Sequence, residues 1–157
     1  ERDDGLDPIQ DQHRRQRFDL RGDMDLTESQ RLEIHGGAVR LDGGAGFAGN
    51  IQDPPRRLEH DSTFAQLRWT TTRSHSESFS ATFYTYREKL RDSYRVQAGA
   101  GLGTLVDYRS DIVRNDLELE HHVAPNEVTR IVWGLGVRRD SIRAPGLFNT
   151  RSVSSTN

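Results

Sequence analysis

His60 and Ser62 are the two residues whose types and spacing come nearest to a nucleophilic site. Residues two apart in a strand lie on one face, so the imidazole could activate the hydroxyl as a general base. Such a site also needs a third group that orients the histidine, and no position in the sequence identifies it. An outer-membrane hydrolase that uses Ser62 and His60 is therefore a minor hypothesis. We expect no catalytic residues, and we expect the chain not to be an enzyme.

Glu118, Glu120 and His122 form a second candidate set, with ligand types suited to a hard or borderline metal at strand spacing. The neighbouring His121 points to the opposite face, so the two histidines cannot bind one ion together. A solvated row of charges is the more ordinary interpretation, with Arg130 as a possible partner of Glu120. The sequence therefore predicts no metal site and no cofactor.

Two glycine stretches and one tripeptide resemble ligand-binding motifs. The glycine stretches lack residues that phosphate binding requires, and the tripeptide lacks the required position. "GAGLGT" (99–104) has no Lys-Ser/Thr pair to reach phosphate, and Gly134-x-Gly136 has neither a third glycine nor a following helix. Arg21-Gly22-Asp23 falls inside a predicted strand rather than at a loop tip. Net charge is −2 with a pI near 6.3, which gives no general attraction to nucleic acid.

Strict alternation of apolar and polar residues organises the chain. In "RFDLRGDMDL", Phe18, Leu20 and Met24 share one face while aspartates and arginines share the other, which is the period of a strand. Similar runs predict six long strands, joined by connections that alternate between short and long, at roughly 15–26, 31–41, 62–72, 78–88, 108–123 and 128–139. The fold class is therefore all-β, an antiparallel up-and-down β-meander.

Three properties favour a transmembrane β-barrel over a soluble sheet. The predicted strands exceed the usual 5–6 residues, the short and long connections alternate, and one face is dense in charges that suit a water-filled lumen. Trp69 and Phe79 flank a short turn, where an aromatic girdle would lie. Because six strands leave two unpaired edges, we interpret 1–157 as a partial β-barrel domain without a plug domain. A soluble antiparallel β-sheet binding domain with long ligand loops is the alternative.

Several segments together resemble a known family. "PPRRLEHDSTFAQLRW" followed by "SFSATFYTYREKLRDSY", and "NDLELEHHV" followed by "RIVWGLGVRRDS", are similar to the barrel region of TonB-dependent outer-membrane receptors. The resemblance covers most of residues 13–140. It implies a Gram-negative outer membrane and energised uptake of a scarce, bulky solute, a ferric siderophore or cobalamin. It also implies a plug domain and the TonB complex as partners.

The chain shows neither a plug, nor a TonB box, nor the terminal aromatic residue of such barrels, so we expect a mid-barrel fragment. Side chains that face the lumen, with the loops at 42–61 and 88–107, could bind an anionic or aromatic solute. They could equally line the wall or contact a plug. The candidate ligand-binding residues are Arg68, Tyr84, Tyr86 and Arg138.

Overall fold

The structure is a computed structural model that describes residues 12–97, 102–144 and 151–154, and every regular element in these ranges is a strand. The strands are β1 (His13–Thr27), β2 (Gln30–Ala45), β3 (Arg56–Ser74), β4 (Glu77–Arg91), β5 (Ser93–Gln97), β6 (Leu102–Asp107), β7 (Ser110–Val123), β8 (Ile131–Arg143) and β9 (Arg151–Ser154).

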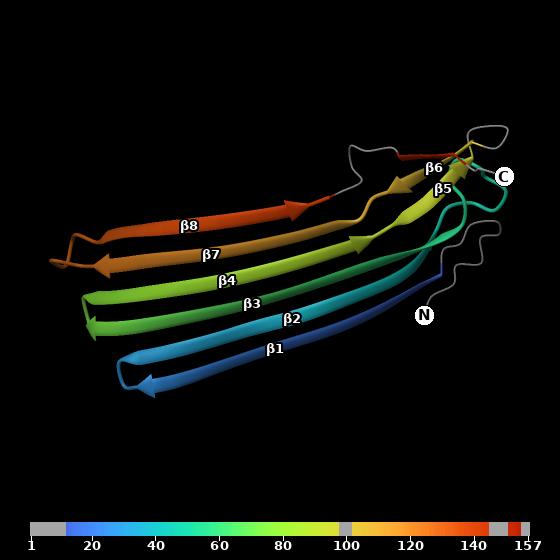
Figure 1. Ribbon diagram of the computed structural model, residues 1–157. Helices are drawn as coiled ribbons and strands as arrows, with labels where there is room; N and C mark the ends of the chain where they lie inside the picture. The colour runs from blue at the N-terminus through green and yellow to red at the C-terminus, as the bar shows by residue number, and fades with distance from the viewer. Residues whose placement is uncertain (1–11, 98–101, 145–150, 155–157) are drawn as a thin grey trace.

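Six of these strands form one antiparallel sheet in the order β1-β2-β3-β4-β7-β8, and β5, β6 and β9 form a separate antiparallel sheet (Figure 1). The large sheet is a meander, because neighbouring strands follow one another along the chain apart from the inserted β5–β6 hairpin. The predicted all-β, antiparallel fold of six long strands is thereby confirmed. Within the described residues the sheet is open, with β1 and β8 as its edges.

The connections sort to opposite ends of the sheet. The three short turns, at 28–29, 75–76 and 124–130, lie together at one end, which we call the turn end (Figure 1). The long connections at 46–55 and 92–109 lie at the other, the loop end. This division follows from antiparallel pairing, since successive hairpins reverse direction at the same two edges.

Five of the six predicted strands were too short at the loop end, whereas the strand predicted from 108 begins later, at Ser110. β2 continues through Gly43 and Gly44, and β3 begins at Arg56, because backbone pairing such as Gly43 with Leu58 extends the ladder through residues of low strand propensity. The segment 88–107, predicted as a loop, contains the end of β4 and the β5–β6 hairpin. β8 also continues beyond its predicted end at 139 to Arg143, and β9 follows at Arg151–Ser154.

The strand predicted from 128 begins instead at Ile131. The Asn126 side chain explains the delay, because its Oδ1 accepts hydrogen bonds from the backbone N–H groups of Val128 at 3.1 Å and Thr129 at 2.8 Å. Such an Asx turn holds these residues out of the ladder.

The register places all six predicted apolar sets on one face of the sheet. Directly paired residues share a face, and the pairs Met24–Leu32, Leu32–Trp69, Trp69–Ala81, Ala81–Leu119 and Leu119–Leu135 continue across every strand. We call this face A. It carries the even-numbered residues of β1 and β2 and the odd-numbered residues of β3, β4, β7 and β8. The remaining residues form face B.

Face A has no protein layer over it among the described residues, in which no hydrophobic side chain is buried. Phe18 is 63% exposed, and Leu135 and Val137 are each 62% exposed. A continuous apolar surface six strands wide is far larger than the isolated exposed hydrophobics of a soluble monomer. The apolar side chains of face A are therefore left uncovered by the described residues.

Gly134 and Gly136 lie on face B of β8 and have unequal surroundings. A Cβ added to Gly134 would lie 2.8 Å from the Leu119 carbonyl oxygen, whereas one added to Gly136 would meet only the Leu117 carbonyl oxygen at 3.9 Å. Gly134 thus permits a close approach of β8 to β7. The glycines belong to a strand and not to a phosphate-binding turn.

Candidate functional site

The four ligand candidates lie together on face B. Tyr84 and Arg138 are the two register partners of Asp116, so the three residues form one row across β4, β7 and β8. Tyr86 lies one face-B position towards the loop end on β4. Arg68 pairs with Thr82, one position towards the turn end. The sequence prediction thus selected neighbouring side chains from three strands, β3, β4 and β8.

Two ion pairs link β7 and β8 beside these residues. Arg138 donates from Nε to Asp116 Oδ2 at 2.8 Å, and Arg114 donates from Nε to Asp140 Oδ1 at 2.8 Å. Arg114, Asp116 and Asp140 were not among the residues predicted from the sequence. Their signal was the matched spacing of Arg114/Asp116 and Arg138/Asp140, which pairs opposite charges only once the hairpin register is known.

A second group begins beside Tyr86. Its hydroxyl donates to Glu88 Oε2 at 2.6 Å, and Glu88 Oε1 is 3.0 Å from His60 Nε2. His60 therefore has a carboxylate partner that the sequence analysis had not located. Within the described residues no hydrogen bond joins His60 to Ser62, so the arrangement differs from a base that holds a nucleophile.

The charges around Tyr84 allow a chemical description of the patch. Arg68 lies 4.0 Å from Glu33 and its side chain is 46% exposed, while the side chain of Arg138 is 57% exposed. Two arginines therefore present N–H groups to solvent on either side of phenol rings on β4. Guanidinium groups recognise carboxylate and phosphate oxygens, and phenols add stacking surface. The patch is suited to an anionic or aromatic solute.

The other sequence candidates do not assemble into sites among the described residues. Glu120 pairs with His122 on its own strand rather than with Arg130, and no group of three metal-ligating side chains occurs in the described ranges. Part of "GAGLGT" lies outside the described residues, and Leu102–Thr104 belong to β6. Arg21 and Asp23 of the tripeptide lie on face B within β1, 3.8 Å apart.

A cluster of polar side chains at the loop end joins β3 to the start of β5. Arg56 donates from Nε to Asp92 Oδ1 at 2.6 Å and also contacts Asp53, and its guanidinium lies 4.0 Å from the centre of the Tyr94 ring. Asp92 is only 6% exposed. Burial raises the pKa of the Tyr94 hydroxyl, which therefore stays neutral at physiological pH. This cluster fixes the base of both long connections.

An ion pair between Asp107 and Arg109, two residues apart in sequence, stabilises the connection between β6 and β7. Arg109 donates to both carboxylate oxygens of Asp107, and these hydrogen bonds hold the pKa of the Asp107 carboxyl below its usual range. The connection between β6 and β7 therefore keeps this ion pair at neutral pH. The pair is lost only when acidification protonates the Asp107 carboxylate.

No family model, curated protein or solved structure matches this chain. Among the residues that the structure describes, no helix is long and apolar enough to cross a membrane.

Proposed function

We propose that this chain forms part of the wall of a β-barrel in a Gram-negative outer membrane. The barrel would be a TonB-dependent receptor that takes up a scarce, bulky solute of the ferric siderophore or cobalamin class. Face A meets lipid in this proposal, and face B lines a water-filled lumen. A plug domain and the TonB complex would be its protein partners.

The oblique course of the apolar band on face A is the observation that carries this proposal. On β1 and β2 the band extends towards the loop end as far as Phe18 and Ala38, which are register partners. On β4 and β8 it ends at Phe83 and Val137, two face-A positions nearer the turn end, while on β7 Val113 lies beyond Asn115 at the level of Ala38. The boundary of the band on the turn-end side also shifts towards the turn end. The band starts at Leu32 on β2, which is level with Leu135, but at Ile131 on β8.

This shift matches tilted strands. Four residues correspond to about 13 Å, and the five strand spacings from β1 to β8 to about 24 Å. A flat boundary would then cross the strands at an inclination of about 30°, close to the roughly 35–45° tilt of membrane barrels. A membrane boundary is flat, so tilted strands must carry an oblique apolar band.

The residues at the turn-end margin of the band support the same orientation. Phe79, His121 and Trp133 form one row on face A, and Trp69 contacts Phe79 with ring centres 6.1 Å apart. Aromatic side chains gather where hydrocarbon meets headgroups. The short turns beyond this row would be periplasmic and the long connections extracellular.

Spin labels on β7 test the membrane assignment. The chain has no cysteine, so single cysteines at 117, 118, 119 and 120 can be labelled selectively within it. In the gene product that carries this chain, reconstituted in bilayers, Leu117→Cys and Leu119→Cys should show high oxygen and low Ni(II) chelate collision rates. Glu118→Cys and Glu120→Cys should show the reverse. A soluble sheet would lack the oxygen excess at 117 and 119, which would refute the assignment.

Arg138 and Arg139 provide a matched pair for the uptake assignment, because they are neighbours on opposite faces of β8. In cells limited for iron or cobalamin, uptake through the native protein is measured with radiolabelled ferric siderophores and cobalamin over a range of concentrations. The concentration of transported solute that gives half-maximal uptake should rise about tenfold in Arg138→Gln, because a charged hydrogen bond to the solute would be lost. Arg139→Gln should leave it unchanged. Uptake of every tested solute that is the same with and without the protein would contradict the proposal.

A further inference from the structure

Face A changes character immediately beyond the apolar band on the loop-end side. On β2 the apolar Ala38 is followed on this face by Arg40, and on β8 Val137 is followed by Arg139. We call the charged region that starts here the outer belt. Its basic members are Arg14, Arg40, Arg57, Arg87, Lys89, Arg91, Arg139 and Arg143, and its acidic members are Asp42, Glu59, Asp61 and Asp111.

The acidic members of the outer belt neutralise only part of its positive charge. Asp42 and Asp61 pair with Arg40, and Asp42 also pairs with Arg57. Arg87 pairs with Asp111 at 2.7 Å, and Arg91 pairs with Glu59 at 2.9 Å.

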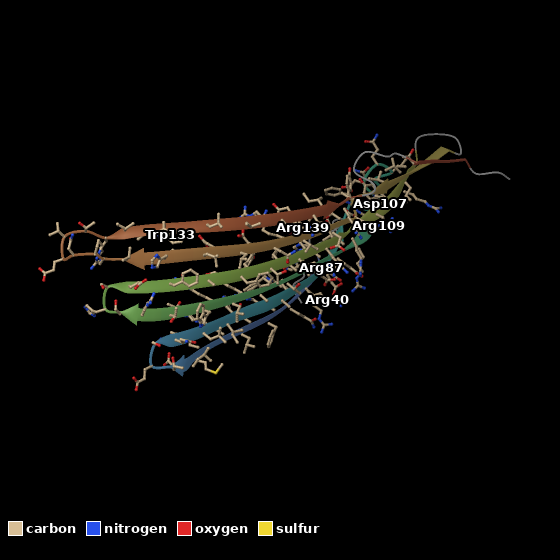
Figure 2. All side chains as sticks on the ribbon, turned by 60° about the vertical axis from the view of Figure 1, so that its left-hand side comes forward. Arg40, Arg87, Asp107, Arg109, Trp133 and Arg139 are labelled. Carbon is tan, nitrogen blue, oxygen red and sulfur yellow. The ribbon has the colours of Figure 1, made fainter. Side chains whose placement is uncertain are left out.

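Four further cations make no ion pair with a described residue: Arg14, Lys89, Arg139 and Arg143. Lys89 and Arg143 are the two register partners of Asp111, and Arg139 lies two face-A positions from Arg143. Figure 2 shows Arg40, Arg87 and Arg139 at a similar level along the sheet, with Trp133 towards the turn end. The belt therefore has an excess of positive charge along one level of the surface.

Face B changes in the opposite sense at this level. Its central rows carry Asp116, Arg138 and other charges, but its loop-end rows carry apolar side chains on five strands: Val39, Leu41, Leu58, Leu90, Ile112 and Ile142. These apolar side chains share the loop-end rows of face B with polar residues such as His60 and Glu88. On face A the same boundary separates apolar side chains from charged ones.

We propose that the outer belt binds the phosphate groups of anionic lipid headgroups. This inference rests on the proposed membrane orientation, which places the belt at the outer margin of the hydrocarbon. Lipids are favoured over a soluble anion because the cations directly continue the apolar band, so one lipid could contact both. Each cation near an anionic membrane surface adds to the attraction, and salt screens it.

The test compares two triple variants with the same change in charge. Lys89→Gln, Arg139→Gln and Arg143→Gln together neutralise the belt. Arg31→Gln, Arg73→Gln and Arg130→Gln remove three cations near the turn end. The reconstituted gene product is probed with spin-labelled phosphatidic acid and phosphatidylcholine, whose motionally restricted fractions give relative association constants.

The native protein should select phosphatidic acid, and the belt variant should lose this selectivity by about fivefold, whereas the turn-end variant should retain it. High salt should reduce the native preference. Equal association of both lipids, or equal losses in the two variants, would overturn the proposal. Inorganic phosphate that abolished the preference at low millimolar concentration, with sulfate as an ionic-strength control, would assign the belt to free anions and also overturn it. Absence of any restricted lipid would instead refute membrane insertion.

Discussion

Leu67→Arg is expected to destabilise the folded, membrane-inserted protein by about 2–4 kcal/mol. Leu67 lies on face A of β3, between Ile34 and Phe83, and its side chain is 42% exposed with no protein layer over it. In the proposed orientation this position is near the middle of the apolar band. An arginine there must lose hydration or distort the bilayer, and the cost at the midplane of membrane barrels is about 2–4 kcal/mol.

Gln66→Arg is the matched control for this substitution. Gln66 precedes Leu67 and lies on face B between His35 and Tyr84, where a water-filled lumen would hydrate the new charge. We expect its free energy of unfolding to change by no more than about 0.5 kcal/mol, as for ordinary exposed positions. Urea titrations of the gene product in lipid vesicles measure both values. Similar values for the two variants would show that face A is not in hydrocarbon.

The sequence predicted the faces of the sheet more securely than the ends of its strands. Face assignments depend only on the period of two, and Phe18, Leu67 and Val137 all lie on the predicted face. Strand ends depend on pairing partners. Gly44 has low strand propensity but lies opposite Arg57, so the ladder continues through it. No local pattern in the chain signals such tertiary pairing.

In the candidate site, too, the strand period predicted which residues share a face but did not predict which residues pair. Arg68, Tyr84, Tyr86 and Arg138 could be predicted as neighbours, because all four are polar positions on predicted strands of one meander. The ion pairs that orient Arg138 could not, since a shift of one residue in register would place it opposite another partner. The cluster around Arg56 was also missed. It joins residues 36 positions apart at the bases of two loops, where alternation gives no information.

The connection 46–55 begins with Gly46, a glycine whose replacement should be unusually costly. Its φ is +85°, in the left-handed region that residues with a Cβ adopt at a cost of about 1–2 kcal/mol. A Cβ at this position would also clash with the Pro54 carbonyl oxygen and would lie 2.9 Å from that of Asp53. Both are backbone atoms, so relief requires movement of the loop itself.

That movement would extend to the loop-end cluster. The Asp53 carbonyl oxygen accepts a hydrogen bond from the Phe47 N–H at 2.9 Å, and the Asp53 carboxylate contacts Arg56. Displacing this segment weakens a contact that joins β3 to the start of β5. We expect Gly46→Ala to reduce the free energy of unfolding by about 2–5 kcal/mol, the conformational cost plus about 1–3 kcal/mol of overpacking.

Gly49→Ala separates the two contributions, because Gly49 has a similar φ of +79° but nothing within 4 Å of its added Cβ. This variant should lose only the conformational part, about 1–2 kcal/mol. The difference between the two variants in urea unfolding then measures the clash with Pro54. Protease cleavage within 46–55 should also increase more for Gly46→Ala than for Gly49→Ala. If both lose the same stability, Pro54 moves freely and the loop does not depend on this close approach.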